Sequence, residues 1–249
     1  ELDHALLIGG VAMGPQLRQL RFNPRLIIGT PGRIKDHLER GTLKLDRCNI
    51  VVLDEVDRML DMGFVHDITQ ILNAAQKERQ SFYFSATMDA RVSGIINTFS
   101  HDPLLISVKA GQTSANVEQD VVRYRHIDQK IDLLHDTLIT DPAMKAVIFD
   151  DTHRGVEKLT KELVARGFPA DSLHGGKTQG QRARVLQKFK DNQVKLLVAT
   201  DVAARGLDIA DITHVINYSL PQTYDDYVHR IGRTGRADRV GMALTFIEA

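Results

Sequence analysis

The segment Ile50-Val51-Val52-Leu53-Asp54-Glu55-Val56-Asp57 joins a short apolar run directly to a group of acidic residues. Four consecutive apolar residues, three of them β-branched, are typical of a strand buried on both faces of a parallel sheet. Ligands of such sheets bind beyond the carboxyl ends of the strands. Asp54 and Glu55 therefore stand where one carboxylate could hold a hydrated Mg²⁺ and the other could orient or deprotonate a water molecule. A charged turn fits the same residues, because acidic residues commonly open the helix that follows a strand.

Five other short apolar runs are predicted to be strands of the same kind. They cover residues 26–28, 82–84, 146–149, 196–199 and 214–216. Apolar residues at the i, i+3, i+4, i+7 spacing of an amphipathic helix lie between several of these runs. The three stripes are Ile68, Ile71, Leu72 and Ala75; Val92, Ile95, Ile96 and Phe99; and Val156, Leu159, Leu163 and Val164. We interpret the stripes as core, and the alternation of strands and helices predicts an α/β fold with parallel sheets.

The composition bounds the class of protein. The 249 residues are 43% hydrophobic, which excludes a disordered chain, and 32 basic against 32 acidic residues exclude a generic polycation. The single cysteine, Cys48, excludes an internal disulfide framework and indicates a reducing compartment. No apolar stretch approaches the ~20 residues of a membrane span. We therefore expect a cytoplasmic protein that does not enter a membrane.

The length predicts two domains. The regular pattern lapses between Ser107 and Val117 in a polar stretch with Gly, Ser and Thr, which we interpret as a linker. The expected division is a first domain at 1–108, a linker at 109–118 and a second domain at 119–249. Because the chain opens at Glu1 in the middle of a pattern, we expect the first domain to lack its N-terminal part. Two domains on a flexible joint would leave a cleft, and such clefts are preferred ligand sites.

Three further strands end in polar residues. Ser85-Ala86-Thr87 follows one of them, Thr200-Asp201 another, and Gly29-Thr30-Pro31-Gly32-Arg33 a third. In the last segment we predict that Thr30 is an N-cap and Pro31 the first helical residue. The helix N-terminus with Arg33 beside it is then suited to phosphate. Each segment alone also fits a plain strand-to-helix turn.

A basic, glycine-punctuated segment runs from His229 to Arg239 as His-Arg-Ile-Gly-Arg-Thr-Gly-Arg-Ala-Asp-Arg. Arginines at a spacing of three present planar forks suited to bidentate contact with phosphate oxygens, and glycines allow a close approach of the backbone. Such arginines could stabilise charge on a transferring phosphoryl group. The alternative is a solvated basic turn.

Two other kinds of site have little support. Gly175-Gly176-Lys177-Thr178 resembles the end of a P-loop, Gly-x-x-x-x-Gly-Lys-Ser/Thr, but residue 171 is Asp instead of Gly, so we reject it. The histidines show no metal-ligand spacing.

The motifs together resemble those of DEAD-box ATP-dependent RNA helicases, over essentially the whole chain. Thr30-Pro-Gly-Arg33, Asp54-Glu-Val-Asp57, Ser85-Ala-Thr87, Ala199-Thr-Asp-Val-Ala-Ala-Arg-Gly-Leu-Asp208 and His229-Arg-Ile-Gly-Arg-Thr-Gly-Arg236 occur in the order of that family. Arg58-Met-Leu-Asp-Met-Gly-Phe64 and Leu173-His-Gly175 look most like its bacterial branch. The resemblance implies two RecA-like domains, ATP as substrate with Mg²⁺, and RNA bound through its backbone without sequence readout. It also implies a monomer, whose protein partners stay undefined.

The resemblance assigns roles position by position. Asp54 and Glu55 match the pair that handles Mg²⁺ and the attacking water, and Arg233 and Arg236 match the arginines that reach the γ-phosphate. Asp208 matches the residue that touches the ATP ribose. The residues that match the coupling of nucleotide state to domain closure are Asp57, Ser85, Thr87, Arg205 and His229. The positions that match RNA contacts are Gly9, Gly10, Thr30, Pro31, Gly32, Arg33, Gln179, Arg182 and Thr200.

The chain departs from the family pattern in two ways. Val56 stands where the family signature has Ala, and we expect a tolerated packing change. The family's adenine-reading glutamine, its P-loop lysine and one RNA motif are absent from the 249 residues, so we expect this chain alone not to hydrolyse ATP.

Two other functions remain to be weighed against an RNA-dependent ATPase. One is an ATP-independent RNA clamp, which the intact Asp54, Glu55, Arg233 and Arg236 disfavour because a pure binder needs no hydrolytic residues. The other is a DNA helicase of the wider superfamily, although the motifs match the RNA-acting branch more closely.

Overall fold

The computed structural model describes residues 2–107, 116–204, 209, 211–236 and 239–249. The chain divides into two compact units, Glu1–Ser107 and Val108–Ala249. Most of the predicted linker lies outside the described residues, and the first strand of the second unit begins at Val117, inside the predicted linker range. The α/β fold with parallel strands is confirmed in both units.

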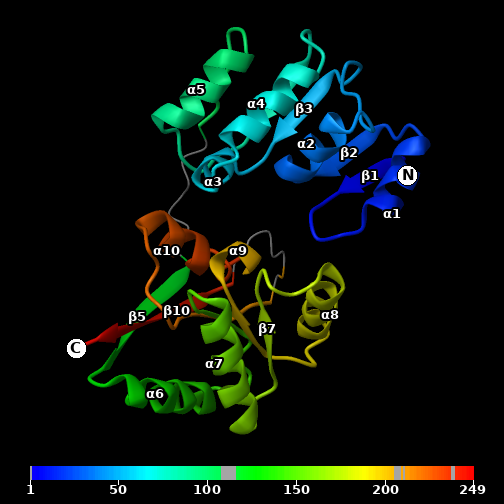
Figure 1. Cartoon of the computed structure of the whole chain (residues 1–249). Helices are drawn as coiled ribbons and strands as arrows, with labels where there is room; N and C mark the ends of the chain where they lie inside the picture. The colour runs from blue at the N-terminus through cyan, green and yellow to red at the C-terminus, as the bar shows by residue number, and fades with distance from the viewer. Residues whose placement is uncertain (1, 108–115, 205–208, 210, 237–238) are drawn as a thin grey trace. The chain divides into compact units, whose positions relative to one another are not determined.

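The first unit contains two separate parallel strand pairs flanked by helices (Figure 1). Its elements are β1 (His4–Leu7), α1 (Met13–Arg21), β2 (Leu26–Gly29), α2 (Pro31–Glu39), β3 (Ile50–Leu53), α3 (Val56–Asp61), α4 (Val65–Ala74), β4 (Gln80–Tyr83) and α5 (Ala90–Phe99). Strand β1 pairs with β2, and β3 pairs with β4. The predicted apolar run at 50–53 is β3 itself, and Phe84 lies just beyond the end of β4.

The prediction that these strands are buried on both faces is wrong for the first unit. One face of β1, β3 and β4 packs on the helices, with Leu7, Leu53 and Tyr83 directed into the core. The alternate residues are exposed: Leu6, Leu26, Ile28, Ile50, Val52 and Phe82 are all at least 40% accessible. The physical reason is the two-residue period of a strand, which turns every second side chain to a face that no described helix covers.

The second unit is a six-stranded parallel sheet with the order β5-β10-β9-β6-β8-β7. Its elements are β5 (Val117–Tyr124), α6 (Ile127–Thr140), β6 (Ala146–Phe149), α7 (His153–Ala165), β7 (Ala170–Leu173), α8 (Gln179–Lys190), β8 (Leu196–Ala199), α9 (Asp201–Ala204), β9 (His214–Asn217), α10 (Tyr224–Ile231) and β10 (Gly241–Glu248). The chain leaves β6 first toward the β7 edge and later returns to the other side of β6. The carboxyl end of β6 is therefore a topological switch point, where ligands of open α/β sheets bind.

Helices cover both faces of this sheet (Figure 1). Helices α6 and α7 pack on one face, and α8 and α9 on the other, with α10 over β5 and β10. Connections that run toward β7 use the first face and those that run back use the second, so all crossovers share one hand, as the rule for parallel strands requires.

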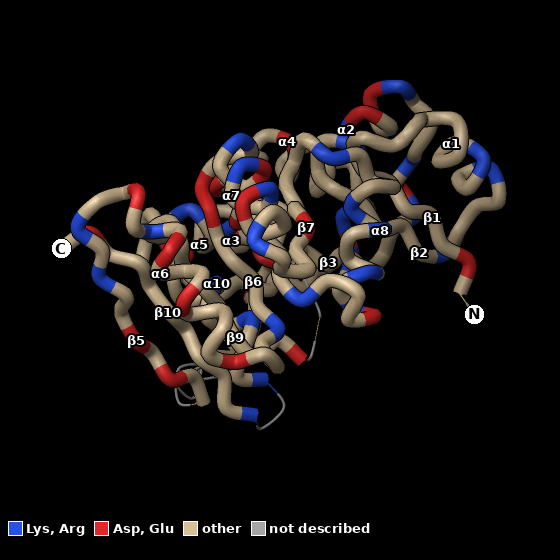
Figure 2. The backbone as a smooth tube through the Cα atoms, turned by 90° about the horizontal axis from the view of Figure 1, so that it is seen from below, with Lys and Arg blue, Asp and Glu red and all other residues tan. Residues whose placement is uncertain are grey.

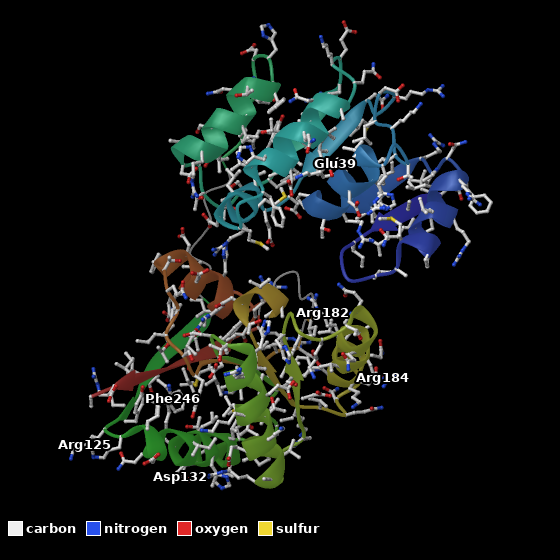
Figure 3. All side chains as sticks on the ribbon, viewed as in Figure 1. Glu39, Arg125, Asp132, Arg182, Arg184 and Phe246 are labelled. Atoms are coloured by element: carbon white, nitrogen blue, oxygen red, sulfur yellow. The ribbon has the colours of Figure 1, made fainter. Side chains whose placement is uncertain are left out.

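Burial of the second unit agrees with the predicted core. Strands β6 and β8 are buried at every residue. Phe246 of β10, labelled in Figure 3, packs among residues of α6 and α7. Val164 is 52% exposed, which corrects its place in the predicted core stripe. It directly follows Leu163, so it lies about 100° around the helix from that buried residue.

Charges of both signs are interspersed along the backbone of each unit (Figure 2). Arg166 and Asp132 form one surface ion pair at 2.7 Å, and Lys35 and Asp67 form another at 3.0 Å. Within the described part of the chain, no helix has the length and apolarity required to span a membrane.

The exposed strand face of the first unit predicts binding of apolar dyes. Replacing Ile50 and Val52 with Thr should lower the fluorescence of bound anilinonaphthalene sulfonate, because Thr keeps the β-branch and removes apolar area. The midpoint of unfolding should stay unchanged, since both side chains already face solvent. As a control, Leu53→Ala on the buried face should lower the free energy of unfolding by about 2–5 kcal/mol. Unchanged dye fluorescence in the double variant would contradict this account of the face.

Candidate functional site

The predicted acidic pair stands at the carboxyl end of β3. Asp54 and Glu55 are both exposed, and an Asp54 carboxylate oxygen (Oδ1) accepts the Glu55 backbone N–H at 3.0 Å. Glu55 has φ 53° and ψ 50°, the left-handed conformation, at the N-cap of α3. A non-glycine residue held there is strained, and such strain persists only where the surroundings over-determine it. The turn thus holds two carboxylates in solvent at the sheet edge, and Val56 beside them is fully buried in the core.

Asp57 joins the ends of β3 and β4 through a closed hydrogen-bond network. Its Oδ2 accepts from the backbone N–H of Thr87 at 2.9 Å and from the Thr87 hydroxyl at 3.1 Å. Its own N–H donates to Ser85 Oγ at 3.3 Å, and Ser85 Oγ donates to the Thr87 carbonyl at 2.7 Å. The structure therefore brings together Asp57, Ser85 and Thr87, the three residues of the first unit for which the family resemblance predicts a coupling role.

The electrostatics of Asp57 follow from this network. The residue is 5% exposed, and burial alone would raise the pKa of its carboxyl group. Hydrogen bonds from Thr87 and from the Arg58 N–H outweigh burial and lower the pKa of Asp57 below its ordinary value of 3.8. Asp57 is consequently an anion at neutral pH, although it is buried.

The Gly9-Gly10 turn follows β1 and is exposed. Gly10 has φ +73°, which only glycine adopts without strain. The buried amide of Gln16 holds this turn, since its Nε2 donates to the carbonyl oxygens of Ile8 and Val11 at 3.2 and 3.3 Å. Arg33 Nη1 also donates to the Val11 carbonyl, at 3.0 Å. The sequence prediction included Gly9, Gly10 and Arg33 but missed Gln16, which lies within an ordinary helical stretch and gives no local signal.

Helix α2 begins as predicted, with Thr30 at the N-cap and Pro31 at the first helical position. The Thr30 side chain makes no capping hydrogen bond, so its hydroxyl is not engaged at the helix start. Arg33 lies 3.8 Å from Asp36 as well as contacting Val11, so it is both ion-paired and loop-bound. The four predicted RNA positions from Thr30 to Arg33 thus form the first turn of α2 beside the Gly9-Gly10 turn.

A buried arginine organises the carboxyl edge of the second unit. Arg230, on α10, is 1% exposed and forms two hydrogen bonds of 2.7 Å with the Asp201 carboxylate at the end of β8. Its Nη1 donates to the Ser219 carbonyl at 2.6 Å, and its guanidinium lies 5.0 Å from the centre of the Phe149 ring at the end of β6. One side chain therefore ties together the ends of three strands. The sequence prediction passed over Arg230 in favour of its neighbours, because a pattern of arginines does not reveal which of them faces inward.

Three titratable side chains at the carboxyl edge of this sheet, Asp151, Lys130 and Tyr218, have shifted pKa values. Burial raises the pKa of Asp151, and the attraction of Arg230 only partly opposes this. Lys130 lies over the rings of Tyr124 and Tyr218 at 4.8 and 4.3 Å, and burial lowers its pKa. Burial also raises the pKa of Tyr218 to about 12. This edge of the sheet is therefore a partly desolvated, charge-rich environment.

Arg233 and Arg236 follow α10 at fixed positions. Arg233 Nε donates to the His229 carbonyl at 3.3 Å, and Arg236 Nε to the Gly232 carbonyl at 2.8 Å. Thr234 is 2% exposed, and its hydroxyl donates to the Ile212 carbonyl at 2.6 Å. Gly235 has φ +68°, and a Cβ there would lie 2.6 Å from Val117. Gly235 therefore lets this segment lie against the start of β5, whereas the predicted close approach of its backbone to phosphate stays a prediction.

The rejected P-loop resemblance has a structural explanation. Lys177 of the Gly-Gly-Lys-Thr segment lies 3.3 Å from Glu157 in an ion pair. Thr178 caps α8 in a capping box with Gln181, and the predicted RNA residues Gln179 and Arg182 lie in the first turns of that helix.

Of the predicted positions Thr200, Arg205 and Asp208, the structure describes only Thr200. Thr200 is only 7% exposed, and its N–H donates to the Leu173 carbonyl at 3.2 Å. Arg205 and Asp208 lie outside the described residues. Asp54 and Glu55 belong to the first unit, whereas His229, Arg233 and Arg236 belong to the second.

The donor set at Asp54 and Glu55 suits Mg²⁺, which binds oxygen ligands and usually keeps several waters beside one or two carboxylates. Among the described residues there is no group of three or more Asp, Glu, His or Cys that could enclose a metal. The carboxylate oxygens of Asp54 and Glu55 fit a hydrated Mg²⁺.

Comparisons with known proteins match both units. The family model described as "DEAD/DEAH box helicase" matches residues 1–95, and that described as "Helicase conserved C-terminal domain" matches residues 129–238. The ATP-dependent RNA helicase CshA of Listeria monocytogenes is 48% identical over 241 residues, covering 96% of this chain and 46% of the relative. The chain spans about half the length of the curated relatives it matches.

Two solved structures extend the comparison. A DEAD box protein from Methanococcus jannaschii is 39% identical with a TM-score of 0.52, over 100% of this chain and 67% of the other. Dbp5 of Saccharomyces cerevisiae bound to RNA and ADP BeF3 is 28% identical with a TM-score of 0.86, over 100% of this chain and 64% of the other.

The lowered pKa of Asp57 predicts a pH dependence of stability. A carboxylate whose pKa is lower in the folded state stabilises the fold above its unfolded pKa, and the contribution disappears as pH falls through the folded pKa. The free energy of unfolding of the wild type should therefore exceed that of Asp57→Asn at neutral pH, and the difference should narrow below pH 3.8. Urea titrations between ~pH 7 and ~pH 2 measure this difference, with the exposed Asp46→Asn as the control. A difference that stays constant across the range would contradict the proposed anionic network.

Proposed function

The chain belongs to the DEAD-box family of helicases, and from this premise we propose that the protein is an RNA-stimulated ATPase that locally unwinds RNA duplexes or remodels RNA–protein complexes. The observation that carries the proposal is the placement of two chemically distinct groups, one in each unit. The acidic pair Asp54 and Glu55 follows the carboxyl end of β3, and Arg233 and Arg236 lie on a segment that Thr234 and Gly235 hold against the starts of β9 and β5.

Hydrolysis in this proposal divides among named side chains. Asp54 would hold Mg²⁺ through its water shell, and the ion would supply charge neutralisation at the ATP phosphates. Glu55 orients the attacking water and accepts its proton. Arg233 and Arg236 contact the γ-phosphate, where a planar guanidinium can bind two oxygens at once. Asp208 contacts the ribose.

Coupling between nucleotide and RNA rests on the hydrogen-bond networks at the sheet edges. In the first unit, Asp57 joins the end of β3, which carries Glu55, to Ser85 and Thr87 after β4. A shift of one strand end would therefore displace the other. We assign His229 and Arg205 the corresponding role in the second unit.

RNA binding is assigned to positions that present backbone groups and helix N-termini. These are the Gly9-Gly10 turn, the first turn of α2 from Thr30 to Arg33, and Gln179 and Arg182 at the start of α8. Thr200 is assigned to RNA on the family resemblance alone, since its N–H already donates to the Leu173 carbonyl. Helix N-termini and guanidinium groups bind phosphate without reading bases, so binding should be independent of sequence. We place the protein in the cytoplasm and expect it to act as a monomer.

RNA-stimulated ATP hydrolysis by the full-length protein tests the proposal. Glu55→Gln should lower kcat by roughly 10²–10⁴-fold, because the amide cannot accept the proton of the attacking water. RNA affinity should be retained. Glu39→Gln, on the exposed side of α2 (Figure 3), is the matched control and should leave kcat unchanged. The 249-residue chain, which contains no Gly-x-x-x-x-Gly-Lys-Ser/Thr motif, should show no stimulated turnover.

Three outcomes would count against this function. If the Glu55→Gln variant kept the wild-type kcat, Glu55 would not be the base that accepts the proton of the attacking water. If RNA did not stimulate ATP hydrolysis by the wild type, the protein would not be an RNA-dependent ATPase. Equal stimulation by DNA of the same length would favour a DNA helicase.

A further inference from the structure

We infer that Glu157 is a positioning residue for RNA binding: it fixes the loop that begins α8 and thereby holds Gln179 and Arg182 in place. The inference rests on the proposed function, which assigns those two residues to RNA, and it adds a residue on another helix that no motif includes. Glu157 lies in the middle of α7 and is separated in sequence from the loop it holds.

A single carboxylate oxygen of Glu157 collects three donors from the opposing segment. Its Oε1 accepts from the Ser172 hydroxyl at 2.7 Å, from His174 Nε2 at 2.8 Å and from Lys177 Nζ at 3.3 Å. Ser172 lies in β7, whereas His174 and Lys177 lie in the loop after it. One side chain of α7 thus holds both the end of β7 and the loop that leads to α8.

His174, which is held by Glu157, also accepts a hydrogen bond from the backbone of the loop. The ring is 8% exposed, and its Nδ1 accepts the Gly176 N–H at 3.1 Å. Because Nδ1 is an acceptor, Nε2 carries the proton that it donates to Glu157, so both contacts define one neutral tautomer. The Lys177 N–H donates to the His174 carbonyl at 3.1 Å, which closes the turn.

The loop packs closely around the two histidine rings. A Cβ on Gly175 would lie 3.3 Å from His153 Nε2, and one on Gly176 would lie 3.1 Å from the His174 ring. The two histidine rings have centroids 4.9 Å apart. Glycine at both positions therefore lets the loop lie against the rings, and this packing supports the His174 orientation that reaches Glu157.

The loop that Glu157 holds leads directly into the start of α8. Thr178 follows Lys177 directly and caps the helix, and the Thr178 N–H donates to Gln181 Oε1 at 2.8 Å. Arg182 is one turn into the helix and makes no side-chain hydrogen bond or ion pair with any residue that the structure describes. Its guanidinium is thus available for phosphate, while its backbone position is set by the loop.

The charge state of Glu157 supports this role. Hydrogen bonds from His174 and then Ser172 lower the pKa of Glu157 to about 2, with Lys177 adding to the effect. The carboxylate is therefore ionised throughout the pH range in which an RNA-binding enzyme works, and it can hold Lys177 continuously.

Helix α8 carries a second arginine, Arg184, that can serve as a control for Arg182. Arg182 and Arg184 are two residues apart, so they leave α8 about 200° apart, and Figure 3 labels both. Arg184 is exposed and, like Arg182, has no side-chain hydrogen bond or ion pair among the described residues. A role for Arg182 in RNA binding therefore has an internal control of the same chemistry on the opposite side of the helix.

The test measures the KM for RNA and kcat of ATP hydrolysis in the full-length protein. Glu157→Ala should raise the KM for RNA by roughly 5–10-fold, with kcat at saturating RNA within about twofold of wild type, because only binding geometry is disturbed. Glu157→Gln keeps an acceptor oxygen for Ser172 and His174 but loses the charge facing Lys177, so its effect should be intermediate. Glu162→Ala, at an exposed position of α7, should have no effect.

A double-mutant cycle separates positioning from general stability. If Glu157 acts through α8, Glu157→Ala should add less than about twofold to the KM for RNA once Arg182 is Ala, whereas it should keep its full effect in an Arg184→Ala background. Equal effects in both backgrounds would overturn the inference. An unchanged KM for RNA in Glu157→Ala would also overturn it.

Hydrogen exchange at the Gly176 amide distinguishes failure of this inference from failure of the proposed function. The amide should exchange faster in Glu157→Ala, because His174 is released, while the midpoint of unfolding stays close to wild type. Unchanged exchange would overturn the positioning role and leave the RNA assignment intact. Faster exchange combined with no effect of Arg182→Ala on the KM for RNA would remove α8 from the RNA site, and the positioning role would fall with it.

Discussion

The second unit depends on the buried contact between Arg230 and Asp201. A guanidinium that is 1% exposed lies among the ends of β6, β8 and β9, and its charge is matched by a carboxylate that it contacts through two hydrogen bonds of 2.7 Å. A buried charge without such a partner would cost several kcal/mol. The pair therefore fixes where α10 sits on the sheet, and the segment with Arg233 and Arg236 follows from the end of that helix.

In the first unit, a buried, hydrogen-bonded anion holds the ends of two strands together. Asp57 is held by backbone and hydroxyl donors from the end of β4, and two residues before it Glu55 occupies a left-handed conformation. Parallel strands end at one edge of a sheet, so polar residues that follow different strands gather there without being close in sequence. Both units thus use a buried ionic group to hold the carboxyl ends of their strands in place.

Much of this organisation follows from local patterns in the sequence. The runs at 50–53, 146–149 and 196–199 are strands with the same bounds, because a continuous apolar run between turn residues has few alternatives in an α/β protein. The start of α2 at Thr30 and Pro31 was also predictable, since the chemistry of helix caps is local. Motif order identified the family.

Other features could not be predicted, because they depend on which residues meet in three dimensions. An arginine that faces the core, Arg230, has the same neighbours in sequence as one that faces solvent. Gln16 and Glu157 contact loops that are distant in sequence or lie on another element, and neither belongs to a pattern. The exposed strand face of the first unit also differed from prediction, because an apolar run does not say whether both faces find a covering layer.

The coupling free energy between Arg230 and Asp201, measured by a double-mutant cycle on urea unfolding, tests the central claim most directly. Arg230→Met should be strongly destabilising, by about 3–5 kcal/mol, because it leaves the Asp201 carboxylate without the guanidinium that pairs with it. Asp201→Asn should destabilise the fold less, because Asp151 stays 3.4 Å from the buried guanidinium of Arg230. The double variant should be less destabilised than the sum of the two, with a coupling of at least about 2 kcal/mol. Additive effects, or single variants as stable as the wild type, would contradict the claim that this pair holds the edge of the sheet together.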